Sequence, residues 1–233
     1  MRSLLVLAFL IPAGASVKAQ ETIEPGSKSL NQAYFKPASI FQKLSWIDKD
    51  GVLTRQATLN CVTRIDSANR RLIYLQLRND GKKDSTIVEW PSLKPIYTAT
   101  FIGTKEFIYD YRAGNTVKNT TTQNGRVEKD TSFTAQSPYF DSYLTDYLFG
   151  ALPLKPGYHG QFKIGSGASA TVSIRDVFTD VLSSGNAATT QAYVVIVDYN
   201  GYKVTYWLDK VSGEMIKSIY QGPDGSIFMK SRI

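Results

Sequence analysis

The feature that most constrains this chain is the regular recurrence of tight turns between short apolar runs. Near the C-terminus, Tyr-Asn-Gly-Tyr (199–202), Asp-Lys-Val-Ser-Gly (209–213) and Gly-Pro-Asp-Gly (222–225) separate runs rich in aromatic and aliphatic residues. Asn, Asp and Gly are the residues that tolerate the backbone angles of hairpin turns. Reversals this short join antiparallel strands, because a parallel crossover needs a longer connection. The chain is therefore predicted to be mainly β, with an antiparallel sheet.

The same pattern extends along the chain and predicts about a dozen strands. The expected strands are 41–47, 52–65, 71–78, 85–90, 96–102, 106–111 (continuing toward 121), 126–133, 159–164, 170–182, 190–199, 202–208, 214–220 and 226–233. The run 193–197 is apolar without alternation, which indicates a strand covered on both faces. We find no internal repeat, so we expect one continuous curved sheet rather than two domains.

Residues 137–157 follow a helical spacing instead. Ser137 is a plausible N-cap, Pro138 suits the first turn, and Gly150 suits the end of a helix. The apolar stripe comprises Phe140, Leu144, Tyr147 and Leu148, widened by Tyr139 and Tyr143. Asp141 and Asp146 fall on the narrower polar face. We predict one main α-helix over about 138–149, wrapped by a half-barrel sheet, because its wide apolar face must be covered.

The N-terminus has the order of a secretory signal, with Arg2, an apolar stretch over 4–11 and then small residues. Cleavage fits after Ala19 or after Ala15. An uncleaved membrane anchor is the alternative, but about 10 apolar residues are too few for a span of about 20. We expect a signal peptide over 1–19 that is cleaved near Ala19, an extended lead-in over 20–37 and a single half-barrel domain over 38–233. The protein is thus expected to be exported, either periplasmic or secreted.

Charge and cysteine content exclude several classes of protein. Loss of residues 1–19 removes Arg2 and Lys18 and lowers the formal charge from +7 to +5. The remaining basic residues are scattered, without a basic stripe interleaved with aromatics, so no nucleic-acid partner is expected. No transmembrane segment is expected after residue 19. The single cysteine, Cys61, cannot form an internal disulfide and belongs to an alternating apolar set, which predicts a small buried side chain.

A search for catalytic or metal-binding patterns finds none. The chain has one histidine, His159, and one cysteine, whereas a zinc site usually needs several such ligands. No G-x-S-x-G elbow precedes His159, which is expected in a solvated loop. The helical carboxylates, Asp141 and Asp146, are five residues apart and should point in different directions. We therefore predict no catalytic residues, no metal and no cofactor.

The segment LFGALPLKPGYHGQF (148–162) resembles the "ALPLKEGY" signature of an uncharacterised family of exported bacterial proteins. The aromatic strand and turn at 206–210 and the return strand 215–220 match that family as well. The resemblance covers roughly residues 38–230. It implies a half-barrel similar to that of the lipoprotein carriers and receptors LolA and LolB, in which a curved sheet holds helices and a hydrophobic cavity. It does not imply lipoprotein transport, because the lid helices of those carriers are missing as clear patterns.

The aromatic content, 14 Tyr, 11 Phe and 3 Trp, has two explanations. The side chains either fill a core between helix and sheet, or they line an apolar cavity open to a lipid tail. For the cavity, the candidate ligand-binding residues are Phe140, Tyr143, Leu144, Tyr147 and Trp207. We hypothesise a non-catalytic cell-envelope protein that binds a hydrophobic or amphipathic, lipid-like ligand. The alternatives are a protein-interaction or structural module with a filled core, and an enzyme on the same scaffold.

Overall fold

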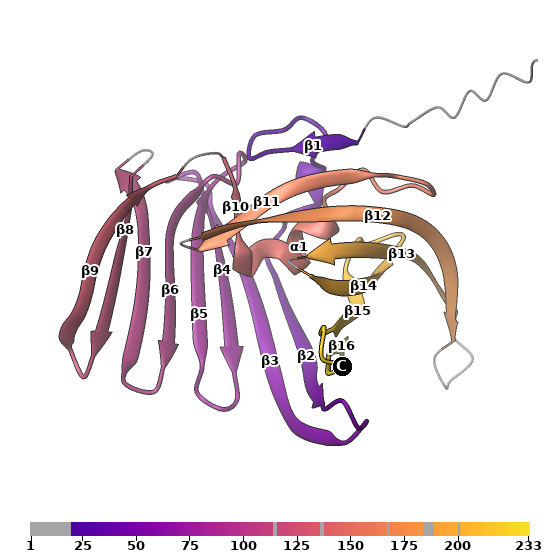
Figure 1. The fold of residues 1–233 in the computed structure, drawn as a ribbon. Coiled ribbons are helices and arrows are strands. Elements are labelled where there is room, and N and C mark those ends of the chain that lie inside the picture. Colours follow the sequence, from indigo (N-terminus) through magenta and orange to yellow (C-terminus); the bar gives the residue numbers. More distant parts are fainter. Residues whose placement is uncertain (1–19, 114–115, 136–137, 167, 184–188, 200) are drawn as a thin grey trace, which may run out of the picture.

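The computed structural model describes residues 20–113, 116–135, 138–166, 168–183, 189–199 and 201–233. The predicted signal peptide over 1–19 and the predicted N-cap Ser137 lie outside these residues. The described chain is mainly β, with a short helical segment enclosed by a strongly curved sheet (Figure 1). Among the described residues, no helix has the length and apolar character needed to cross a membrane.

The strands belong to one 16-stranded sheet. Its N-terminal wing comprises β2 (Ala38–Ile47), β3 (Leu53–Asp66), β4 (Arg71–Arg78), β5 (Lys83–Glu89), β6 (Pro95–Ile102), β7 (Lys105–Ala113), β8 (Thr116–Gln123) and β9 (Arg126–Thr134). Its C-terminal wing comprises β11 (Gly160–Ser166), β12 (Ala168–Ser183), β13 (Thr189–Tyr199), β14 (Tyr202–Asp209), β15 (Met215–Gln221) and β16 (Ile227–Arg232). The two short strands are β1 (Glu21–Ile23) and β10 (Phe140–Asp141).

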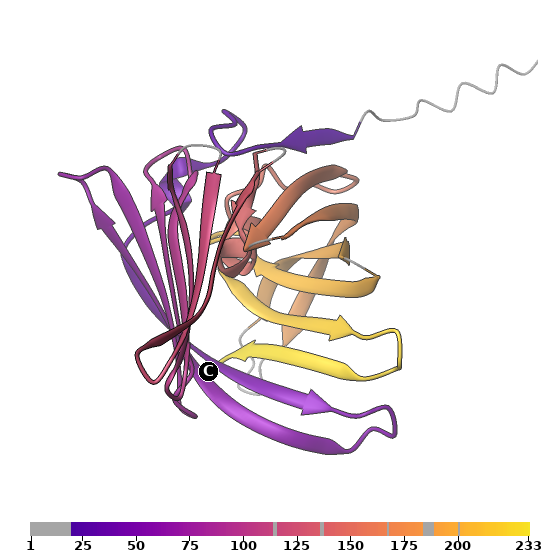
Figure 2. The same cartoon turned by 60° about the vertical axis from the view of Figure 1, so that its left-hand side comes forward.

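The two wings are joined edge to edge by β16 and β2, which pair antiparallel with Phe228 opposite Trp46. Within each wing the strands follow chain order, so almost every connection is a hairpin. Turned by 60°, the wings face each other at an angle with the helical segment between them (Figure 2). The prediction of one continuous, open, curved sheet is confirmed. The short strands β1 and β10 depart from the antiparallel rule, because both pair parallel with β11.

The predicted number of strands, about a dozen, was too low. One missed strand lies in the run from 106 toward 121, where β7 and β8 pair antiparallel, with Ala113 opposite Thr116. The prediction overlooked the Gly114-Asn115 turn signal, which separates the aromatic-rich run 106–111 from the polar run 116–121. The short strands β1 and β10 were also missed, because three and two residues are too few to show an alternation.

The predicted helix over 138–149 is much shorter in the structure. Its first part is the strand β10, followed by a 3-10 turn, η2 (Ser142–Leu144), and a single α-helix, α1 (Thr145–Phe149). Asp141 caps η2 by accepting a hydrogen bond from the Tyr143 backbone N–H. Parallel pairing of β10 with β11 supplies the backbone hydrogen bonds that a longer helix would have made internally. We call residues 142–149 the helical segment.

The lead-in over 20–37 is part of the core. It contains one short helical turn, η1 (Gln32–Tyr34), and the strand β1. Its apolar side chains at 23, 30, 34 and 35 are all buried in the main apolar cluster. The Tyr34 and Phe35 rings contact the Tyr147 ring of α1 at centroid distances of 5.0 and 5.3 Å. The lead-in therefore covers the helical segment where the two wings of the sheet do not.

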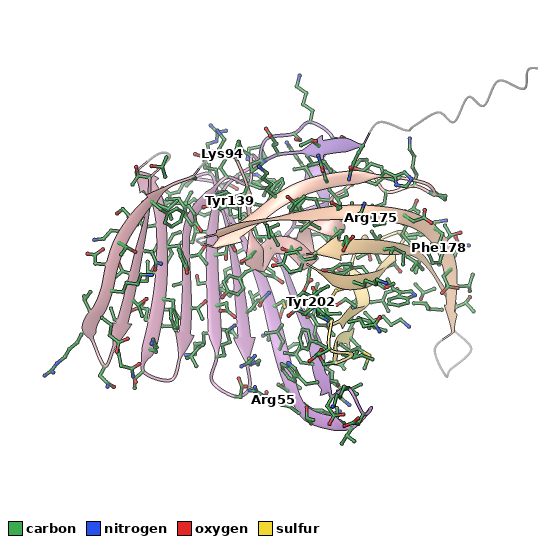
Figure 3. The ribbon with its side chains drawn as sticks, in the orientation of Figure 1. Arg55, Lys94, Tyr139, Arg175, Phe178 and Tyr202 are labelled. Carbon is green, nitrogen blue, oxygen red and sulfur yellow. The ribbon has the colours of Figure 1, made fainter. Side chains whose placement is uncertain are left out.

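The C-terminal wing is buried on both faces at some positions and only on its core-facing side at others. On β13, Val194 and Val195 point to opposite faces and are 2% and 0% exposed. The prediction that both faces of 193–197 are covered is thus confirmed for this strand. On β12, Val177 enters the core, whereas Phe178 is 44% exposed on the opposite face (Figure 3). The core lies inside the curve of the sheet, around the helical segment.

Gly150 directly follows the helical segment, where its backbone lies very close to Tyr34 and Gly213. A Cβ at this position would overlap with the Tyr34 ring and with the carbonyl oxygen of Gly213. Gly150→Ala is expected to lower the free energy of unfolding by about 1–3 kcal/mol, the usual cost of overpacking a core. Urea denaturation measures this cost. Gly222→Ala is the matched control, because a Cβ there meets the flexible side chains of Asp224 and Ser226, and an equal loss in both variants would contradict the prediction.

Candidate ligand-binding cavity

A cavity of about 240 Å³ lies between the helical segment and the two wings of the sheet. Ser142, Tyr143, Thr145 and Asp146 of the helical segment form one side of it. The remaining lining residues come from both wings, and the two wings contribute side chains of different character. The space enclosed by the sheet is therefore not completely filled.

The C-terminal wing contributes an apolar wall. Its lining residues on β11–β14 are Ile164, Val172, Val197, Tyr199 and Tyr206. Ile164, Val172, Val197 and Tyr206 are each 2% exposed or less, so their positions are fixed by the surrounding core. They share one face of the wing because strand alternation sends every second side chain inward. This wall offers a ligand dispersion contacts and no charge.

The N-terminal wing contributes a polar wall. Its lining residues next to the β4–β5 turn are Gln76, Arg78, Lys82 and Asp84. The Arg78 side chain hydrogen-bonds Asp80 at 2.6 Å, and Lys82 lies 3.2 Å from the Asp84 carboxylate. Leu44 and Leu59 connect this wall to the C-terminal wing. The cavity is thus apolar on one side and charged on the other.

An ion pair lies where the two walls meet. Lys230 of β16 is paired with Asp146 of α1, and their side chains are only 15% and 10% exposed. The Tyr220 hydroxyl donates to the other Asp146 oxygen at 2.8 Å, and the Tyr206 and Tyr220 hydroxyls are 2.7 Å apart. Burial is the largest single influence and would lower the pKa of Lys230, but the charge and hydrogen bond of Asp146, together with Tyr220 and Cys61, outweigh it, so the pKa is raised. Lys230 is therefore a buried cation at neutral pH.

A second buried carboxylate, Asp141, ties the helical segment to the N-terminal wing. Its side chain accepts hydrogen bonds from the Thr86 and Thr98 hydroxyls on β5 and β6 and from the Tyr143 N–H. Asp141 is 0% exposed, and this burial raises its pKa to about 6, despite the three hydrogen bonds. The prediction that Asp141 and Asp146 lie on a solvated face was wrong, because the sheet curves over that face as well.

Hydrogen bonds to the N-terminal wing also hold the Tyr143 side chain in place. Its hydroxyl lies 2.6 Å from the Thr100 hydroxyl, which donates to Asp84 at 2.7 Å. Lys82 Nζ lies 5.5 Å from the centre of the Tyr143 ring. Burial raises the pKa of Tyr143, so its hydroxyl stays protonated. The ring therefore forms a fixed part of the cavity rim.

Of the five predicted ligand-binding residues, only Tyr143 lines this cavity. Phe140 and Leu144 are 0% and 2% exposed and pack in the core. Tyr147 stacks on Tyr74 and hydrogen-bonds the Lys36 backbone. Trp207 lies on the opposite face of β14 from Tyr206, with the Lys217 ammonium 4.1 Å from its ring centre. Alternation along 202–209 places the odd and even positions on different faces, and the cavity receives Tyr206.

The other residues singled out in the sequence have no place in the cavity. Cys61 is a free, buried thiol, and burial raises its pKa to about 11, in agreement with its prediction as a small core residue. His159 is half-buried in the loop before β11, and its carbonyl accepts a hydrogen bond from Glu21. Across the described residues, no group of three or more His, Cys, Asp or Glu side chains could hold a metal ion.

Sequence comparison now gives the family. Residues 44–230 match the family described as protein of unknown function (DUF3108). The chain belongs to this family. The match spans both wings of the sheet and the helical segment, so the whole cavity lies within the DUF3108 region. No curated protein matches the chain.

Structure comparison supports the barrel-like description of the DUF3108 fold. A beta-barrel-like protein of domain of unknown function DUF1849 from Brucella abortus matches with a TM-score of 0.54 at 10% identity, over 84% of this chain and 95% of that one. At this identity the likeness shows the fold alone. The structure of the Pseudomonas aeruginosa MucA/MucB complex matches with a TM-score of 0.34 at 11% identity, over 88% of this chain and 53% of that chain. This second similarity is too low to support an inference.

Proposed function

We propose that this protein is an exported, non-catalytic cell-envelope protein that holds a hydrophobic or amphipathic, lipid-like ligand between the helical segment and the sheet. The observation that carries the proposal is the division of the cavity into an apolar wall on β11–β14 and a polar wall beside the β4–β5 turn. Small-molecule sites typically combine an apolar lining with a few convergent polar groups. The N-terminal sequence supports export, and the resemblance to LolA and LolB supports a lipid-like ligand.

To test this proposal, a larger side chain is introduced on the apolar wall of the cavity. Val197 lines the cavity on β13, so Val197→Phe places a ring in the space that a ligand would occupy. We expect the delipidated mature wild-type protein to bind a fluorescent apolar probe saturably. Val197→Phe is expected to weaken that binding at least tenfold, as measured by fluorescence titration, because the ring occupies space along the apolar wall that the probe would contact.

The matched control is Ile196→Phe, which adds a ring on the same strand but on the outer face. It should bind the probe like the wild type. Equal loss of binding in both variants would indicate general damage to β13 and contradict the proposed site. If the wild-type protein binds neither the probe, fatty acids nor phospholipids, the proposed function is wrong, and the protein-interaction alternative becomes the better explanation.

A further inference from the structure

We propose that the ligand is a single-chain amphiphile with an anionic head group, either carboxylate or phosphate. The head group contacts Arg78, Lys82 and Lys230, and the chain lies against the apolar wall of the C-terminal wing. This inference rests on the proposed function and adds the charge of the ligand and the number of its chains.

The hydrogen-bonding capacity of the cavity wall points to an anion. The two carboxylates that line the cavity use both of their oxygens within the protein. Asp146 binds Lys230 and Tyr220, and Asp84 binds Lys82 and Thr100. Neither carboxylate therefore has an oxygen left without a protein partner. Both negative charges are thus already paired with a lysine of the cavity lining.

The cations that line the cavity, in contrast, have hydrogen-bond donors that their ion pairs do not use. Lys82 and Lys230 each carry three N–H donors, and each makes one ion pair within the described part of the chain. Arg78 has five donors and uses its Nε–H on Asp80, which also pairs with Arg55. The three cations therefore keep unused donors at the cavity, and these donors can bind an acceptor or an anion.

These three cations are not ordinary surface residues. The side chains of Arg78, Lys82 and Lys230 are only 19%, 23% and 15% exposed. All three line the same cavity. A charge-assisted hydrogen bond formed in such a partly desolvated place is stronger than one on the open surface. An anionic head group would replace water at these donors.

The size of the cavity limits the apolar part of the ligand. Its volume of about 240 Å³ exceeds the roughly 150 Å³ of an engineered apolar cavity that holds benzene. The space therefore suits one alkyl chain, in part or folded, and is too small for the two or three chains of a phospholipid or lipoprotein anchor. Ile164, Val172 and Val197 would contact the chain.

The experiment compares four amphiphiles that share the same alkyl chain and differ in their head group. Dodecanoate, dodecyl phosphate, dodecanol and dodecyltrimethylammonium are each titrated into the delipidated protein below their micelle concentrations, with displacement of the bound apolar probe as the readout. The two anions are expected to bind about tenfold more tightly than dodecanol, and the cation least tightly. Raising the salt concentration should weaken only the anions, because salt screens charge.

Two lysine variants test the residues. Lys82→Gln removes a donor of the cavity wall, whereas Lys83→Gln removes an equal charge from the neighbouring exposed position. Lys82→Gln should weaken dodecanoate binding about tenfold, the effect of losing one charged hydrogen bond, and leave dodecanol binding unchanged. Lys83→Gln should affect neither ligand. Urea denaturation of both variants shows that the fold is intact.

Three results would overturn the inference while leaving the proposed function in place. These are equal affinity for all head groups, tighter binding of the cationic amphiphile, and equal sensitivity of dodecanoate binding to Lys82→Gln and Lys83→Gln. Inorganic phosphate that displaces the probe as well as dodecyl phosphate does would make the site an anion site without a chain. Two-chain phosphatidic acid binding as tightly as its one-chain lyso form would contradict the single chain. Failure of every amphiphile to bind overturns the proposed function itself.

Discussion

Lys230→Met is expected to lower the free energy of unfolding by about 3–5 kcal/mol, the usual cost of removing one partner from a buried ion pair. The change leaves the buried Asp146 carboxylate beside the Tyr220 hydroxyl but without the cation that neutralises it. Desolvation of that uncompensated charge is the physical cause of the loss. Urea denaturation of the variant and the wild type at pH 7 and one salt concentration measures it.

Two controls define what this loss means. Arg175→Met breaks the ion pair with Asp198, whose side chains are 61% and 43% exposed, and should cost less than about 1 kcal/mol. The double variant Asp146→Leu/Lys230→Met removes both buried charges and should recover most of the stability, because apolar residues often replace a buried ion pair without loss. A Lys230→Met variant as stable as Arg175→Met would contradict the burial of this pair.

That double variant also bears on function. If apolar residues stabilise the fold as well as the ion pair does, then stability alone does not explain two charges beneath the helical segment. Buried charges with perturbed pKa values gather at functional sites. Asp146 keeps Lys230 charged and in place, and Lys230 lines the cavity. Their pairing is therefore consistent with a ligand site on this part of β16.

The fold was largely predictable from sequence because its rules are local. Asn124-Gly125 predicted a hairpin, and both residues adopt positive φ angles, 51° and 76°, between β8 and β9. Alternating side chains marked most strands, and hairpin connections left few choices of topology. The parallel pairing of β10 and β1 with β11 was not predictable, because it joins segments about 20 and 140 residues apart and no local turn brings them together.

The cavity was harder to predict, because a periodic pattern shows which residues share a face but does not show what packs against that face. Helical spacing placed Asp141 and Asp146 on a solvated face, although the curved sheet leaves them only 0% and 8% exposed. Trp207 was predicted to line the cavity, whereas strand register places its neighbour Tyr206 there instead. Arg78 and Lys82 flank a turn in the sequence, where charged residues are usually solvated, and only the curvature of the sheet turns them inward.

The second large effect concerns Asp141, whose burial should make the protein less stable as the pH rises. The pKa of its carboxyl is about 6 in the folded protein, compared with an ordinary value of 3.8. Because the folded state binds this proton more tightly than the unfolded state, the contribution of Asp141 to stability is fully present below pH 3.8. It is lost as the pH rises to 6. The loss amounts to about 3 kcal/mol at roughly 1.4 kcal/mol per pKa unit.

Asp141→Asn isolates this contribution, because asparagine has similar size, can accept the Tyr143 N–H and does not titrate. Relative to the wild type, the variant should gain up to about 3 kcal/mol of stability between pH 4 and pH 7. Urea denaturation of both proteins across that range gives the difference at each pH. Taking the difference removes the contributions of titrating groups that do not interact with Asp141.

Asp66→Asn is a control for which stability is expected to depend on pH with the opposite sign. Asp66 is exposed, and hydrogen bonds from Asn69 lower the pKa of its carboxyl. Its contribution is therefore present at neutral pH and lost as the pH falls through the folded pKa, so Asp66→Asn should become less stable, relative to the wild type, as the pH rises. If Asp141→Asn shows the same slope as Asp66→Asn, the hydrogen bonds from Thr86 and Thr98 outweigh the desolvation of Asp141. The carboxylate would then favour the fold when charged, and its burial would carry no pH-dependent cost.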